Sequence, residues 1–173
     1  MKKSVRYLSV LPALFMLFLI FGFSAQNGET SGSLSYRVCV SLLSFLDRIF
    51  SWNPDSATFA SHAASMQFFV RKAAHITEYF LLTLSIFLPL RVWIPGDITG
   101  KPHLSFLFRH LLPTFLLAVL CAAADEFHQS FVPGRCGTPI DVMIDSIGMG
   151  IGCLVLTFFH FRTHSKQKQN TSF

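Results

Sequence analysis

Long apolar runs separated by short polar segments set the pattern of this 173-residue chain. An α-helix needs about 20 apolar residues to cross the hydrocarbon of a bilayer. The strands of a membrane barrel would alternate apolar and polar residues instead, which runs such as LFMLFLIFGF do not. The pattern therefore predicts four transmembrane helices at residues 7–23, 73–90, 104–124 and 139–161, followed by a C-terminal tail at 162–173.

The long connection between the first and second spans has a pattern of its own. It opens with SAQNGETSGS, whose Gly and Ser residues are typical of a loop. In YRVCVSLLSFLDRIF, apolar residues at helical spacing are interrupted by Arg37, Asp47 and Arg48, which predicts an amphipathic helix at the membrane interface. Asp55 or Ser56 is a suitable cap for the helix that follows. The expected fold is all-α: a four-transmembrane-helix bundle in one domain, with an amphipathic interfacial helix in the first outer loop.

Composition supports a membrane protein. Hydrophobic residues make up 51% of the chain, 20 residues are Phe, and the mean hydropathy is +0.50. Charged residues reach 13%, against roughly a quarter in soluble domains. The first span could be a signal peptide, but its apolar run is longer than the usual 7–15 residues, and cleavage after Ala25 would place Phe23 where a small residue is required. We therefore expect the first span to be retained.

The distribution of cations predicts the topology. Four spans place both termini on one side, which would hold Lys2, Lys3, Arg6, Arg91, Lys101, Arg109, Arg162, Lys166 and Lys168. Short loops rich in Lys and Arg stay in the cytoplasm, so both termini are expected inside. The net charge of +5 then describes an inner rim beside anionic lipid, and it does not indicate nucleic-acid binding.

Polar side chains gather at the predicted outer ends of the second, third and fourth spans. In RKAAHITEYF, for example, Arg71, His75 and Glu78 lie four and three residues apart, which places them on one helical face. An ionisable residue facing lipid at mid-membrane costs roughly 2.5–3.5 kcal/mol, so such residues usually face the bundle interior and mark functional sites. The sequence predicts one outer-face pocket lined by Arg71, His75, Glu78, Tyr79, Asp125, Glu126, His128, Gln129, Arg135, Asp141 and Asp145.

The fourth predicted span also carries a GxxxG pair, Gly148 and Gly152, on the face that holds Asp141 and Asp145. Small residues at this spacing let a neighbouring helix approach closely, so we expect this face to pack inside the bundle. Lys72, taken alone, is best interpreted as an anchor at the membrane interface.

Cysteines and the remaining histidines give weaker signals. Cys39 and Cys136 would both face outward, where a disulfide is chemically permitted, but the sequence does not decide whether they pair. His62, His103 and His110 have no matching partners in the predicted topology.

The residue types in the predicted pocket suit anions. The planar guanidinium forks of Arg71 and Arg135 match phosphate or carboxylate. A divalent cation would be held by Asp125, Glu126, Asp141 and Asp145 with His75 or His128 as a further ligand or an acid/base. Such mixed sites suit several metals, but pairing of the acids with the two arginines is the favoured interpretation. The chain has no P-loop, Rossmann fingerprint, nucleophile elbow or HExxH motif, so whether it is an enzyme stays open.

Four motifs resemble the VanZ-like family of bacterial membrane proteins. They are FSAQNGETSGSLS after the first span, RKAAHITEYFLL opening the second, DEFHQSFVPGR closing the third and DVMIDSIGMGIG in the fourth. The likeness extends from about Phe23 to Gly152. It implies a small multi-pass protein of the bacterial cytoplasmic (inner) membrane, and the family's namesake is linked to tolerance of the glycopeptide teicoplanin. The family supplies no settled reaction, substrate or catalytic residue.

Two functions are compatible with these features. The pocket would bind, and in an enzyme modify, an anionic cell-envelope molecule such as an envelope precursor or a glycopeptide. Alternatively, the protein is a membrane scaffold or partner-binding protein whose polar network fixes helix packing. An open polar cleft favours the first function, and a closed, fully paired network favours the second. Membrane lipid is the expected surrounding in both cases. A third function, transport, would require an oligomer, because four short helices are few for a transporter.

Overall fold

The computed structural model of the chain describes residues 3–94 and 102–170, and this part of the chain is helical with no strand. The elements are α1 (Lys3–Leu8), α2 (Leu11–Ser24), α3 (Gly28–Phe50), α4 (Ser56–Trp93), α5 (Pro102–Phe106), the π-helical segment η1 (Leu107–Leu111), α6 (Leu112–Gln129) and α7 (Pro139–Asn170). The short inner loop that the sequence predicts at residues 96–101, between the second and third spans, lies outside the described residues.

Four helical stretches are long and apolar enough to cross a membrane: Arg6–Ser24, Ser56–Trp93, Pro102–Gln129 and Pro139–Thr163. Each contains one of the predicted spans, so the expectation of an all-α protein with four membrane helices is confirmed. Large apolar side chains remain exposed along all of these stretches, including Phe18, Leu81, Leu120 and Leu154. This exposure suits a lipid solvent, since only the internal face of each helix has to pack against protein.

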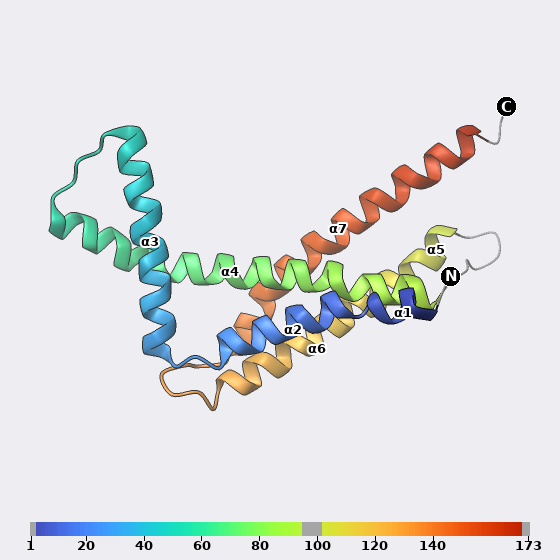
Figure 1. The fold of residues 1–173 in the computed structure, drawn as a ribbon, viewed down its shortest axis with the longest axis horizontal. Coiled ribbons are helices and arrows are strands. Elements are labelled where there is room, and N and C mark those ends of the chain that lie inside the picture. The colour runs from blue at the N-terminus through green and yellow to red at the C-terminus, as the bar shows by residue number, and fades with distance from the viewer. Residues whose placement is uncertain (1–2, 95–101, 171–173) are drawn as a thin grey trace.

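The helices run in three main directions (Figure 1). α2, α4 and α6 run side by side, α7 crosses them obliquely, and α3 runs across the first half of α4. Helix α1 and the last turns of α7 lie at the same end of the bundle, which we call the terminal end. The opposite end is formed by the α2–α3 connection and by residues 130–138, between α6 and α7. We call it the distal end.

The bundle core lies where α4 meets α7. Tyr79 and Leu82 of α4 and Met149 of α7 are fully buried there. A Cβ atom at Gly148 would overlap the carbonyl oxygen of Ile76, and one at Gly152 would stand 3.0 Å from a Thr83 methyl group. The two glycines therefore lie at the closest approach of these helices.

Most of the Gly- and Ser-rich stretch after the first span is helical, and the loop predicted there is confined to residues 25–27. Helix α3 begins at Gly28 because the Asn27 side chain caps it, accepting a hydrogen bond from the backbone N–H of Thr30 at 2.8 Å. Glycine is also required for space, since a Cβ at Gly28 would overlap the backbone of Gly134. The predicted amphipathic helix is the later part of α3.

Helix α4 begins at Ser56, well before the predicted start of the second span at residue 73. The Asp55 carboxylate caps it by accepting hydrogen bonds from the backbone N–H groups of Ala57 at 3.0 Å and Thr58 at 2.8 Å. Hydropathy identifies only the part of a helix that suits hydrocarbon, which explains the difference. The early part of α4 packs against α3 around the buried Cys39. All four cysteines are free.

Candidate functional site

A buried polar network joins the end of α2 to the end of α6. The Ser24 hydroxyl donates to Asp125 Oδ2 at 2.8 Å, and the Gln129 amide donates to the same oxygen at 2.9 Å and to Ser24 at 3.0 Å. Asp125 and Gln129 share one face because they lie one helical turn apart. Asp125 is 0% exposed, and its other oxygen, Oδ1, has no hydrogen-bond partner among the described residues. Sequence reasoning missed Ser24, although it stands in the first family motif.

Arg135 connects this network to the α2–α3 junction. Its guanidinium donates to the carbonyl oxygens of Phe23 at 3.0 Å and Gln26 at 3.1 Å, and to Gln129 Oε1 at 3.3 Å. The turn before it needs glycine, because Gly134 has a φ of 74°. Burial lowers the pKa of Arg135 from its ordinary value, and the nearby charge of Arg71 lowers that pKa further.

Helix α4 presents His75, Glu78 and Tyr79 to the same region. His75 Nδ1 lies 3.8 Å from Asp145 Oδ1 of α7 and 4.0 Å from Glu78 Oε2. The Tyr79 side chain is fully buried beside Asp125, Glu126 and Asp145, without a hydrogen bond of ordinary geometry from its hydroxyl. An imidazole, a phenol and several carboxyl groups thus meet inside the bundle.

The start of α7 is held by α4 and α6. Lys72 forms an ion pair with Asp141 in the first turn of α7, a partner that its interpretation as an interface anchor did not include. Partners on two helices cannot be identified from spacing along one of them. Glu126 is 6% exposed, and its Oε2 accepts a hydrogen bond from the backbone N–H of Thr138 at 3.1 Å.

Two adjoining cavities open at the distal end. The first, of about 200 Å³, has polar lining from Arg71, His75, Glu78 and Arg135 and apolar lining from Leu34, Val38 and Val70, among others. The second, of about 270 Å³, is lined by Phe68, Arg71, Lys72, His75, Glu126, Gln129, Gly134, Arg135, Cys136, Asp141 and Asp145. Arg71, His75 and Arg135 line both. The distal end is therefore a partly open polar site.

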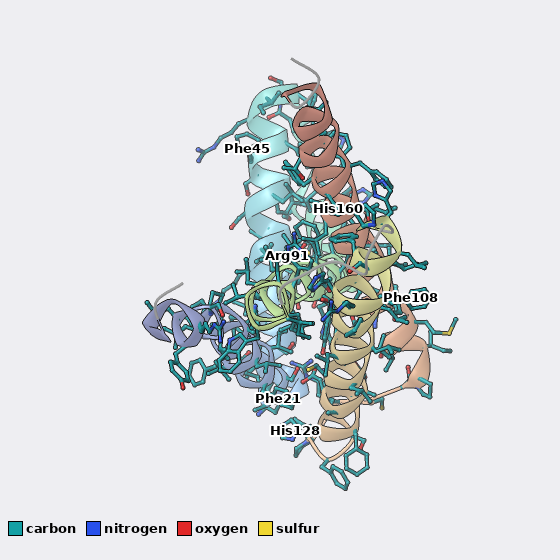
Figure 2. The ribbon with its side chains drawn as sticks, turned by 90° about the vertical axis from the view of Figure 1, so that its right-hand side faces the viewer. Phe21, Phe45, Arg91, Phe108, His128 and His160 are labelled. Carbon is teal, nitrogen blue, oxygen red and sulfur yellow. The ribbon has the colours of Figure 1, made fainter. Side chains whose placement is uncertain are left out.

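The structure brings together all of the sequence-predicted pocket residues except His128. That side chain is exposed, and its ring lies 6.0 Å from the ring of Phe21, at the periphery of the bundle (Figure 2). At 3.6 residues per turn, His128 lies about 60° around the α6 axis from Asp125, on the side away from Gln129 and Glu126. A residue can therefore belong to the right turn of a helix and still face away from the site.

Sequence reasoning also missed a polar cluster at the terminal end. His110 is fully buried and hydrogen-bonds the Arg91 guanidinium at 3.2 Å. The His160 ring stacks on Phe106 at 3.9 Å and lies 5.5 Å from the ring of His103; Figure 2 shows Arg91 and His160 near one another in projection. The expectation that His103 and His110 lack partners is wrong, because their partners come from helices distant in sequence.

His75, Asp125 and Glu126 have the donor types and the proximity of metal ligands. One nitrogen or oxygen atom from each lies within 4.8 Å of the others. They come from α4 and α6, and Asp141 and His128 are not part of this set.

Comparison with known proteins places the chain in a family. A sequence model of the VanZ/LLP1 family matches residues 9–160, from the first span to the fourth. No curated protein and no solved structure matches the chain. With its four apolar helices, this is a multi-pass membrane protein, and it belongs to the VanZ/LLP1 family.

Proposed function

We propose that the distal cavities bind the anionic headgroup of a cell-envelope amphiphile. The observation that carries this proposal is a pair of arginines, Arg71 and Arg135, lining the same partly open cavity. Arg71 has no hydrogen bond or ion pair within the described part of the chain, so its donors are free to meet a ligand. Two guanidinium groups at one cavity repel each other, and a phosphate or carboxylate between them would relieve this repulsion.

The apolar lining supports an amphiphile rather than a free anion. Leu34 and Val38 of α3 and Val70 of α4 line the cavity that holds the two arginines. Because α3 runs across the direction of the spans (Figure 1), it would lie in the plane of the membrane surface, as amphipathic interfacial helices do. Its exposed Phe45 would then enter the lipid, and the cavity would open at the depth of the headgroups.

The orientation in the membrane completes the proposal. Arg6, Arg91, Arg109 and Arg162 lie at the terminal end, on short segments that weigh most in the positive-inside rule. The distal-end cations lie mainly on the long α3–α4 region, which weighs less. The termini would therefore be cytoplasmic, and the distal cavities would face the outside of the inner membrane.

Lipid retention by the purified protein tests the proposal. We would measure native mass spectra with polyprenyl phosphate, phosphatidylglycerol or phosphatidylcholine, in EDTA so that metal plays no part. The anionic lipids should be retained and the zwitterionic lipid lost. Arg71→Gln should weaken retention by about tenfold or more, since a charge-assisted hydrogen bond contributes about 1.5–3 kcal/mol.

The matched control is Arg37→Gln, which removes one exposed positive charge from α3 outside the cavity. It should retain anionic lipid as wild type does. Equal retention of phosphatidylcholine, or unchanged binding by Arg71→Gln, would contradict the proposal. Teicoplanin, added as a competitor, tests whether the ligand class of the family's namesake reaches the same cavity.

A scaffold role is the second candidate function, because Arg135 and the Ser24–Asp125–Gln129 network tie several helices together. The two functions predict different outcomes for Arg71→Gln. If the cavity binds a ligand, Arg71→Gln should lose function at normal abundance in the membrane. If the network is only structural, Arg71→Gln should have no effect, while Asp125→Asn should lower abundance and function in proportion.

A further inference from the structure

We propose that His75, Asp125 and Glu126 bind a divalent transition-metal ion, with Zn²⁺ as the representative ion. The three side chains supply one imidazole and two carboxylates from α4 and α6. Imidazole with carboxylate oxygen is a donor set used for zinc and related ions. Calcium and magnesium sites are built mainly from oxygen, so the imidazole favours a transition ion.

The distances suit a site that tightens on binding. The donor atoms of the three residues lie within 4.8 Å of one another. Around zinc, nitrogen and oxygen ligands at about 2.0–2.2 Å lie about 3.4 Å from each other in a tetrahedron. The separations would therefore shrink by at most about 1.4 Å. Rotation of the side chains can supply this movement while the helices keep their positions.

Hydrogen bonds hold one oxygen of each carboxylate and leave the other oxygen available to a metal ion. Ser24 and Gln129 both donate to Asp125 Oδ2, and the buried Oδ1 has no hydrogen bond of ordinary geometry among the described residues, although the Tyr79 hydroxyl approaches this carboxylate. Thr138 N–H holds Glu126 Oε2 in the same way. Ligating carboxylates are typically fixed by such outer hydrogen bonds while the other oxygen meets the metal. Buried His75 Nδ1 also lacks a hydrogen bond.

The buried carboxylates at this site also lack a neutralising partner. Asp125, Glu126 and Asp145 are at most 6% exposed, and none has an ion pair with Lys or Arg among the residues that the structure describes. Arg135 donates to carbonyl oxygens and Gln129 instead, and Lys72 pairs with another acid. The pairing of these acids with the arginines, expected from sequence, is therefore not the arrangement found. Unpaired buried carboxylates are costly, and a dication would offset that cost.

This inference goes beyond the anion site and can be tested without lipid. His75 and Glu126 line the second cavity together with Arg71 and Arg135. Three protein ligands leave an open coordination position on zinc. An oxygen of an anionic headgroup held by the arginines could occupy it, so the metal and the guanidinium groups would recognise the same ligand.

Metal content of the purified full-length protein tests the proposal. The protein, carrying a tag without histidine, is stripped with EDTA, incubated with ZnCl₂ and separated from free metal by gel filtration. Wild type should retain about one zinc per chain, and Asp125→Asn or His75→Gln should reduce zinc affinity at least about tenfold. Ser24→Ala, which leaves the ligands in place but removes a hydrogen bond to Asp125, should weaken it by about tenfold.

His128→Gln is the matched control, because it removes an exposed imidazole from the same helix, and it should bind zinc like wild type. If wild type retains no zinc, or if His75→Gln retains as much as wild type, the proposal is overturned. Should the ligand variants fail to fold, X-ray absorption of the wild-type zinc complex decides: one imidazole among oxygen ligands supports the site, while sulfur or several imidazoles overturns it. The lipid assay contains EDTA, so the two proposals fail separately.

Discussion

Replacing Gly148 with alanine should force α7 away from α4. The added Cβ would overlap the Ile76 carbonyl oxygen and stand 3.1 Å from the Phe80 nitrogen. Both are backbone atoms of a buried helix, so neither can move without shifting α4 itself. Gly150 lies on the same helix with nothing within 4 Å of its Cβ position, and Gly150→Ala is therefore the matched control.

The difference between these two variants isolates the packing cost. Both exchange glycine for alanine inside α7, so the gain in helix propensity, about 0.5–1 kcal/mol in soluble helices, cancels between them. Overpacking typically costs about 1–3 kcal/mol, which corresponds to a difference in Tm of roughly 2–12 °C for a protein of this size. Gly152→Ala should fall between them, because its Cβ would meet the Thr83 side chain at 3.0 Å rather than backbone.

Thermal unfolding in detergent, followed by the fluorescence of Trp52 and Trp93, measures this order. We expect Gly150→Ala to be the most stable of the three variants, Gly152→Ala the next and Gly148→Ala the least stable. A Gly148→Ala protein that unfolds at the same temperature as Gly150→Ala would refute the reasoning, since α4 and α7 would then not be in close backbone contact.

Three further predictions concern topology, helix capping and the Lys72–Asp141 pair. Cys136 is an exposed native thiol at the distal end, and it should react with a membrane-impermeant maleimide on intact cells. Thr163→Cys in a Cys136→Ser background should react only after permeabilisation. The reverse order would place the distal end inside. Asp55→Ala should speed proteolysis at the α3–α4 turn at neutral pH, because it removes the cap of α4. Hydrogen bonds from the backbone of the first turn lower the pKa of Asp55. The cap is therefore fully effective above the ordinary carboxyl pKa and is lost as the pH falls through the lowered pKa of Asp55. Below that pH, wild type and variant should be cleaved equally. Lys72→Met should lower the free energy of unfolding by about 1–3 kcal/mol in thermal unfolding, since it leaves the partly buried Asp141 unpaired. The double variant Lys72→Met with Asp141→Leu should recover most of this loss. A double variant as unstable as the single one would contradict the prediction.

The sequence by itself determined the membrane spans, the cap of α4 and the gathering of polar residues at the distal end. Each of these depends on local physical chemistry. Transfer of apolar side chains into hydrocarbon marks a span wherever it falls in the fold, and a carboxylate such as Asp55 caps a helix through hydrogen bonds to the next few residues. Helical spacing also places His75 and Glu78 on one face before any neighbour is known.

Only the tertiary structure decided which of these faces meet. Rotation of α6 about its axis turns Asp125 inward and leaves His128 at the periphery, and the approach of α7 to α4 pairs Lys72 with Asp141. Ser24 joins Asp125 across a separation of 101 residues. Partner choice depends on helix crossing and on the close packing of whole helices, which are collective properties of several segments and leave no periodic trace in any one of them.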